Sequence, residues 1–203
     1  FVISPGLSNS EKISNEDSSV NSYTIDNNNS LNRFTGTDKL DNSKRLNLSF
    51  NINSESLNAA FLQSYEFTDN SNFHYSQGNE KKLSDFLGIV SVTKNSLKTN
   101  YDFRYDSNES YLKSQKLTLG YNSYLGNFNF NYLDQNSKVD EIIVSDLETL
   151  NYEFKSKKIN KFSEITYFGL YDLKNEINTE SGISYSYFDE CFGVNIDFKR
   201  NSY

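Results

Sequence analysis

The stretch Leu97–Asp106, with the sequence LKTNYDFRYD, decides the fold class of this chain. Every second side chain is leucine, threonine or aromatic, and the side chains between them are Lys98, Asn100, Asp102, Arg104 and Asp106. Successive side chains of a β-strand point to opposite faces, so a period of two separates these two sets. The stretch therefore predicts a strand with one mainly apolar face and one charged face.

The same alternation recurs over most of the chain. It marks about ten segments of roughly nine to thirteen residues, plus a short one at Phe1 to Ile3. Strands of soluble proteins usually have ~5–6 residues, whereas a tilted strand needs ~9–11 residues to cross a membrane. The further segments with this pattern include 46–52, 57–67, 117–121, 128–132, 150–154, 183–187 and 192–198.

Alternation by itself fits two architectures. In a soluble sandwich the apolar face packs on a second sheet, whereas in an outer-membrane barrel it faces lipid and the polar face lines a wet lumen. The segment lengths, the 35% hydrophobic content and the many Tyr and Phe side chains favour the barrel. We therefore predict an all-β antiparallel meander, without a helix longer than two turns, that forms part of a large transmembrane outer-membrane β-barrel. The lumen-facing candidates are Lys98, Asn100, Asp102, Arg104 and Asp106.

The composition excludes several functional classes. A net charge of −7 disfavours binding to phosphate backbones, so we expect no nucleic-acid partner. One Cys and one His exclude an internal disulfide framework and a paired-histidine metal site. The single histidine, His74, lies in a polar stretch without a G-x-S-x-G motif, which favours a solvated loop residue over a catalytic base. We expect no enzyme activity, no metal and no cofactor.

The connectors between the segments alternate in length along the first part of the chain. Barrels of the outer membrane have short periplasmic turns and longer external loops. This parity places Glu55, Asn95, Gly126 and Asp189-Glu190 on the periplasmic side, and loops 4–42, 68–84 and 135–141 outside the cell.

The long first connector contains two polar motifs. They are Asn15-Glu16-Asp17-Ser18 and, farther on, Leu31-Asn32-Arg33-Phe34-Thr35-Gly36-Thr37-Asp38. Clustered carboxylates offer oxygen ligands to a divalent cation. A turn bonded through its own Asn, Asp and Ser side chains is the simpler interpretation.

These two motifs resemble the LPS-assembly protein LptD family. The run NEDS at 15–18, followed by LNRFTGTD at 31–38, is the specific part of the likeness. Weaker likenesses follow in the same order at 60–65, 84–88, 101–106, 182–185 and 189–192, so the resemblance extends over nearly the whole chain. The family-motif residues in this numbering are Asn15, Glu16, Asp17, Ser18, Leu31, Asn32, Arg33, Phe34, Gly36 and Asp38.

The resemblance implies the C-terminal half of a large barrel that exports lipopolysaccharide to the cell surface. On this view residues 1–203 are a fragment of the barrel domain, without the N-terminal jellyroll and without the lateral seam. The implied partners are lipopolysaccharide, the plug lipoprotein LptE, and the periplasmic bridge protein LptA through the N-terminal domain. The polar face is then either a hydrated wall with cross-strand pairs or a surface for the plug or for phosphorylated sugar headgroups. A general outer-membrane porin is the alternative, and a barrel-shaped enzyme is a third.

Cys191 is the most informative single residue of the chain. A lone Cys is usually a small buried hydrophobe. Cys191, however, follows Asp189-Glu190 at a predicted periplasmic turn and alternates with Phe192 and Val194, which predicts a thiol on the polar face. The oxidising periplasm favours pairing of such a Cys with another segment. The resemblance implies a disulfide to the N-terminal part, although the family has an adjacent Cys pair where this chain has Glu190-Cys191.

Overall fold

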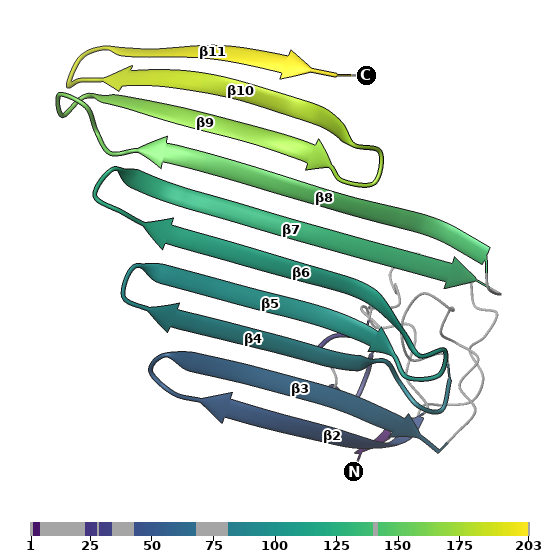
Figure 1. Ribbon diagram of the computed structural model, residues 1–203. Helices are drawn as coiled ribbons and strands as arrows, with labels where there is room; N and C mark the ends of the chain where they lie inside the picture. The colour runs from purple at the N-terminus through teal and green to yellow at the C-terminus, as the bar shows by residue number, and fades with distance from the viewer. Residues whose placement is uncertain are drawn as a thin grey trace.

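A computed structural model of the chain describes residues 2–4, 23–27, 29–33, 43–67, 81–139 and 142–202. These residues form one antiparallel sheet of eleven strands whose spatial order is the order of the sequence (Figure 1). The described residues contain no helix, and so none that is long and apolar enough to cross a membrane. The predicted all-β meander, ten strands and a short N-terminal one, is confirmed.

The strands are long, and most have between nine and fifteen residues. Their bounds are β1 (Val2–Ser4), β2 (Ser43–Asn53), β3 (Leu57–Glu66), β4 (Phe86–Lys94), β5 (Leu97–Asp106), β6 (Tyr111–Asn122), β7 (Gly126–Val139), β8 (Ile142–Ser156), β9 (Ser163–Asp172), β10 (Ile177–Phe188) and β11 (Gly193–Asn201). The first and last strands do not pair with each other, so the described sheet is open.

The register gives the sheet two chemically different faces. Tyr101 pairs with Leu117 and Leu97 with Tyr121, and paired residues of antiparallel strands share a face. The prediction that Tyr101, Phe103 and Tyr105 lie on the same face as Leu117, Leu119 and Tyr121 is therefore confirmed. We call this side the apolar face, and the side of Asp102 the polar face.

Two glycines on the apolar face make room for aromatic rings of the neighbouring strand. A Cβ atom at Gly88 would lie 2.2 Å from the Phe103 ring, and one at Gly169 would lie 2.3 Å from the Tyr152 hydroxyl oxygen. The rings thus lie flat over the backbone of the next strand. Glycine is needed here because any other side chain would occupy the space of the ring.

The apolar side chains form a band that runs obliquely across the strands. In β5 the face carries only apolar, aromatic or threonine side chains from Leu97 to Tyr105, which at ~3.3 Å per residue corresponds to roughly 26 Å along the strand. Toward the loop end the band is bounded by Gln115 in β6, Asp134 in β7, Glu148 in β8 and Arg200 in β11. Its edge therefore shifts toward the turn end from β5 to β11.

The connectors divide between the two ends of the sheet. The turns around Glu55, Asn95, Tyr124, Asn160 and Glu190 lie at one end, here called the turn end (at the left in Figure 1), and the other connectors lie at the loop end. The common location of the predicted tight turns is thus confirmed, except that Gly126 and Asn127 already belong to β7.

The predicted loop 135–141 is wrong over residues 135–139. These residues continue β7 and pair with β8 as far as Val139 opposite Ile142. Their polar sequence indicated a loop, but backbone pairing between strands does not depend on side-chain polarity. The β7–β8 hairpin therefore extends beyond the apolar band.

Candidate functional site

A segment of the first long connector lies on the polar face at the loop end of the sheet. We call residues 23–27 and 29–33 the inner segment. Tyr23 is 1% exposed and packs with Leu62 and Leu87, and Ile25 packs against this cluster. Leu62 and Leu87 are cross-strand partners, so β3 and β4 together form an apolar patch within the polar face. This patch explains why an aromatic side chain of the connector is buried there.

A buried ion pair holds the end of the inner segment. Arg33 Nη2 lies 3.1 Å from Glu66 Oε2, and both side chains are less than a tenth exposed. Glu66 also accepts hydrogen bonds from the Ser43 hydroxyl at 2.6 Å and from the Lys44 backbone N–H at 3.0 Å. A buried charge is tolerated only when it is paired and its remaining oxygens are hydrogen-bonded, and Glu66 meets this condition.

Two further arginines bind backbone carbonyls of the inner segment. Arg104 of β5 donates to the Tyr23 carbonyl oxygen at 2.5 Å, and the buried Arg45 of β2 donates to that of Ser30. Charge-assisted hydrogen bonds of this kind are stronger than neutral ones. The inner segment is therefore fixed to the sheet at both ends and in the middle.

Burial also changes the acidity of Tyr23. Desolvation raises the pKa of Tyr23 to about 12, although a hydrogen bond with Ser84 and the positive charges of Arg33 and Arg45 act in the opposite direction. The phenol is therefore neutral under physiological conditions.

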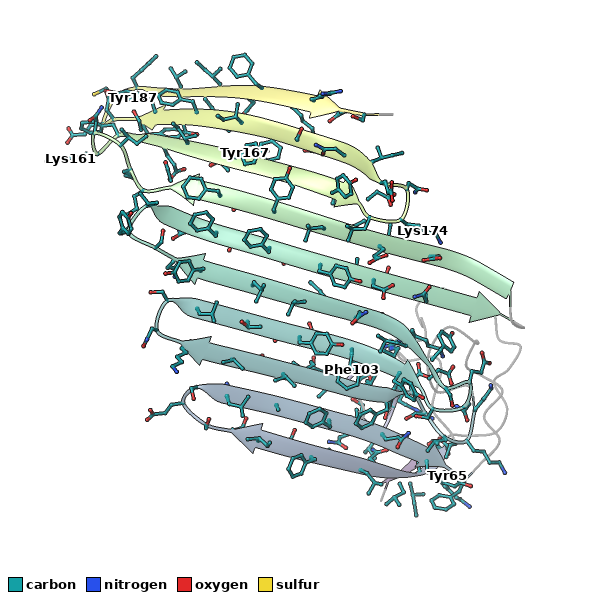
Figure 2. The ribbon with its side chains drawn as sticks, viewed as in Figure 1. Tyr65, Phe103, Lys161, Tyr167, Lys174 and Tyr187 are labelled. Atoms are coloured by element: carbon teal, nitrogen blue, oxygen red, sulfur yellow. The ribbon has the colours of Figure 1, made fainter. Side chains whose placement is uncertain are left out.

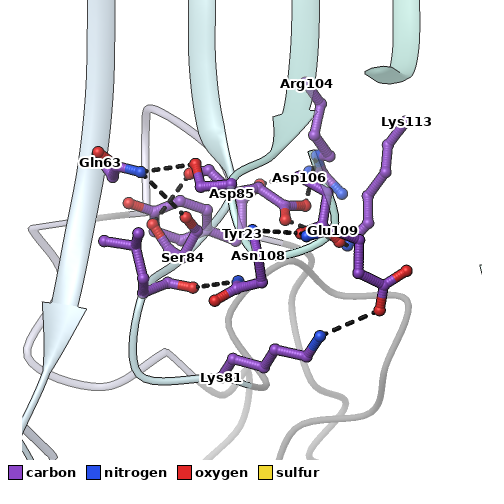
Figure 3. Close-up of polar contacts among 12 residues, drawn as sticks. Tyr23, Gln63, Lys81, Ser84, Asp85, Arg104, Asp106, Asn108, Glu109 and Lys113 are labelled. Carbon is purple, nitrogen blue, oxygen red and sulfur yellow. Dashed lines mark hydrogen bonds and ion pairs between the residues drawn. The ribbon is translucent and has the colours of Figure 1, made fainter. Parts of the chain in front are cut away.

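A second charged cluster surrounds Asp85, close to Tyr23 of the inner segment (Figure 3). Lys113 Nζ lies 3.1 Å from Asp85 and 2.9 Å from Asp106, and Arg104 Nε lies 4.0 Å from Asp85. Lys113 is the extra residue of a bulge in β6, because the pairing of β5 with β6 shifts between Arg104 and Tyr105. A bulge redirects a side chain, which here places the ammonium group between the two carboxylates.

Side-chain bonds also connect the loops of this end to one another (Figure 3). Gln63 donates to the Ser107 hydroxyl at 2.7 Å, and Asn108 donates to the Leu83 carbonyl oxygen at 2.8 Å. Lys81 and Glu109, both exposed, form a further ion pair between the two loops, with 3.0 Å between Lys81 Nζ and Glu109 Oε1. The two loops before β4 and after β5 thus form one bonded unit.

A groove of about 300 Å³ opens between the inner segment and strands β4 to β7 on the polar face. Its lining combines apolar and charged side chains, among them Ile25, Leu87, Ile89, Leu133, Arg104 and Lys116. Lys116 forms no ion pair within the part of the chain that the structure describes. The groove can therefore offer both a cation and an apolar surface to a ligand.

The family model for LptD, LPS transport system D, matches residues 1–177 of this chain. The match includes the inner segment, both charged clusters and the groove. The chain belongs to the LptD family. None of the curated proteins matches the chain. The LptD match ends at Ile177, the first residue of β10, so Cys191 lies beyond it.

The structure places all five strand candidates on the polar face. Lys98, Asn100, Asp102, Arg104 and Asp106 alternate along β5, and Asn100 donates to Asp102 at 2.8 Å. Arg104 and Asp106 belong to the charged cluster, whereas Lys98 lies near the turn end.

The motif residues of the first connector are only partly described. Arg33 forms the buried ion pair, Leu31 is exposed and Asn32 is half-buried. Asn15, Glu16, Asp17, Ser18, Phe34, Gly36 and Asp38 lie outside the described residues, and so does His74. The turn that the sequence favours over a cation site at 15–18 therefore stays a prediction.

Four functional residues were not among the candidates predicted from the sequence, namely Tyr23, Glu66, Asp85 and Lys113. Glu66 was detectable in principle, because it lies on the polar phase of a strand with Ser64 and so faces away from Tyr65. The position of Asp85 depends on a loop conformation, and that of Lys113 depends on a bulge in β6. Neither feature has a periodic signal in the sequence.

Cys191 lies in the turn between β10 and β11, at the turn end as predicted, and is exposed. Its backbone N–H donates to Asp189 Oδ1 at 2.9 Å, and so does that of Phe192 at 2.8 Å. These N–H groups and the Tyr187 hydroxyl lower the pKa of Asp189. Because β11 begins only at Gly193, the alternation of that strand does not set the direction of the thiol.

Proposed function

We propose that this chain is part of the outer-membrane translocon that inserts lipopolysaccharide into the outer leaflet. The apolar face contacts lipid, the polar face lines the lumen, the loop end lies outside the cell and the turn end lies in the periplasm. The observation that carries this proposal is the oblique apolar band on one face of an LptD-family sheet, opposite a face rich in charges and amides. A soluble sheet would have no reason to expose such a band.

The polar face offers suitable contacts for a phosphorylated saccharide. Arg104 and Lys116 supply positive charge at the groove, and Ile25 and Leu133 supply apolar surface for sugar rings. Transport requires no covalent chemistry from these residues, because the chain only has to bind the headgroup weakly and release it. The inner segment lies over this same face and so narrows the path along it.

The partners of the proposed assembly follow from the same orientation. The plug lipoprotein LptE would contact the polar face, where amide side chains alternate along β7 and β8, among them Asn127, Asn129, Asn131 and Asn151. The bridge protein LptA would act through an N-terminal domain outside this sequence. Cys191, at the turn end, would form a disulfide with that domain in the oxidising periplasm.

Site-specific photocrosslinking in living cells tests the proposal. The crosslinking amino acid p-benzoylphenylalanine is introduced at Lys116 of the polar face in the full-length protein. Leu119, on the apolar face of the same strand, is the matched control position. We expect a lipopolysaccharide adduct from position 116, and none or only a membrane-lipid adduct from position 119.

The opposite pattern would overturn the proposal. A lipopolysaccharide adduct from position 119 alone would show that the apolar face is the transport surface. Equal absence of adducts at position 116 and at further polar-face positions, such as Asn100 and Asn131, in a correctly assembled protein would favour a general porin instead.

A further inference from the structure

The β8–β9 turn combines positive charge with apolar side chains. It has the sequence Lys157-Lys158-Ile159-Asn160-Lys161-Phe162, and all six residues are exposed. We call these residues the lysine turn. It carries three positive charges in a protein whose net charge is −7, so it is a local cluster of positive charge in an acidic protein.

The lysine turn is a built structure and not a loose loop. Ile159 and Ser163 exchange backbone hydrogen bonds of 2.6 and 2.9 Å, with Asn160 and Lys161 in left-handed backbone conformations at φ 52° and 64°. The Lys157 N–H donates to the Leu125 carbonyl oxygen of the preceding turn at 2.9 Å. The backbone that carries the lysines is therefore held in a fixed position relative to the sheet.

Exposed apolar side chains surround the lysine turn. The Phe162 ring lies 6.0 Å from that of Tyr187, and Figure 2 shows Lys161 close to Tyr187 at the turn end. The neighbouring turns add large exposed side chains, namely Tyr124, Leu125, Phe188 and Phe192. Tyr124, at 81%, is the most exposed of the large hydrophobic side chains among the described residues.

The three lysines have no ionic partner within the described residues, although carboxylates are near. Lys155, at the end of β8, is the lysine that pairs with Glu164, at 2.9 Å. Asp189 of the next turn is bonded to its own backbone and to the Tyr187 hydroxyl, and the adjacent Glu190 forms no ion pair with described residues. The ammonium groups of Lys157, Lys158 and Lys161 are thus available to an external anion.

The apolar band leads directly to the lysine turn. Phe154, three positions before the turn, pairs on the apolar face with Tyr167, five positions after it. The ring centroids of Phe128 and Phe154 are 4.6 Å apart. Aromatic side chains collect at the level of lipid headgroups, and lysines beside them meet the phosphates. This order along β8 and β9 places the ammonium groups at the membrane surface.

We propose that the lysine turn, with the apolar side chains of the neighbouring turns, is a docking surface for anionic phospholipid headgroups in the leaflet at the turn end. The ligand class is a phosphodiester lipid with a net negative charge, such as phosphatidylglycerol. The inference rests on the membrane orientation given under the proposed function. Its consequence is a preference for anionic lipid at this side of the sheet.

Lipid retention by the purified protein tests this inference. The full-length protein is reconstituted with equal amounts of phosphatidylcholine and phosphatidylglycerol, and the lipids that remain bound are counted by native mass spectrometry. The variant Lys157→Gln/Lys158→Gln/Lys161→Gln is compared with Lys81→Gln/Lys82→Gln/Lys174→Gln, which removes the same charge from the loop end. We expect the first variant to lose at least about fivefold in the ratio of retained phosphatidylglycerol to phosphatidylcholine, since each lysine near an anionic surface contributes to binding.

The controls separate the possible failures. The control variant, and a variant with arginine at the three turn positions, should keep the wild-type lipid ratio. An unchanged ratio in the glutamine variant, or an equal loss in the loop-end control, would overturn the docking surface but leave the proposed function intact. If bound lipid or detergent does not cover the apolar face as a band, both the docking surface and the proposed function are wrong.

Discussion

Arg33 and Glu66, thirty-three positions apart in the sequence, form an ion pair of 3.1 Å that is almost completely shielded from solvent. One partner belongs to the inner segment and the other to the end of β3. The pair therefore ties a connector to the polar face of the sheet, next to the groove.

Removal of Glu66 should release the inner segment. Glu66→Ala leaves the Arg33 guanidinium buried without its carboxylate, which costs about 3–5 kcal/mol in comparable sites. We expect faster hydrogen exchange in the segment around 29–33, measured by mass spectrometry. The control is Glu109→Ala, which breaks the exposed pair with Lys81 and should change exchange by no more than ~1 kcal/mol. Equal exchange in the two variants would contradict the role of the buried pair.

Alkaline pH should loosen the inner segment through Tyr23. Because burial raises the pKa of Tyr23 to about 12 in the folded protein, the phenol contributes stability below its ordinary pKa of 10.0, and this contribution is lost as the pH rises toward 12. A spin label at Asp26→Cys, in a Cys191→Ser background, should become more mobile in this range. In the Tyr23→Phe variant this rise in spin-label mobility between pH 10 and 12 should be absent. If the rise is unchanged in that variant, groups other than Tyr23 cause it.

Gly88 should not tolerate alanine. The added Cβ atom would lie 2.2 Å from the Phe103 ring, which must then move off the backbone at a cost of about 1–3 kcal/mol. Gly120→Ala is the control, because the nearest atom there is 3.6 Å away. Urea denaturation in detergent measures both, and Gly88→Ala/Phe103→Leu should recover most of the loss. Equal midpoints for the two alanine variants would refute the packing argument.

Charge should be tolerated on the polar face and not within the apolar band. Leu119→Arg places a guanidinium in the middle of the band, which costs about 2–4 kcal/mol near the midplane of a bilayer. Thr118→Arg, at the adjacent position on the polar face, should have little effect. Folding yield into lipid vesicles, read by heat-dependent electrophoretic mobility, distinguishes the two. A larger loss for Thr118→Arg would reverse the assignment of the faces.

Cys191 should be oxidised in the assembled full-length protein. Its exposure at the turn end places it toward the periplasm in the proposed orientation. Non-reducing electrophoresis of native membranes should show a disulfide-linked species that disappears in Cys191→Ser. If a maleimide reagent labels Cys191 quantitatively in the mature protein, the thiol is free and this prediction is wrong.

Local periodicity was sufficient for the strands and for the two faces. The alternation from Leu97 to Asp106 depends only on the geometry of a single strand, so it predicted β5 and the common side of Tyr101 and Leu117. The specific motif in the first connector also indicated the LptD family without any structural information. In β7, polar residues suggested a loop at 135–139, because the pattern reports burial and not backbone pairing.

The sequence by itself therefore determined the fold class, the two faces of the strands and the family, since each is encoded in neighbouring residues. Only the tertiary structure decided which groups meet on the polar face. Arg104 and the Tyr23 carbonyl oxygen are 81 positions apart, and their contact requires the connector to fold back over β3 to β5. Lys113 reaches Asp85 only because a bulge in β6 turns it to that side. Contacts of this kind arise from the path of the whole chain, and no local period specifies them.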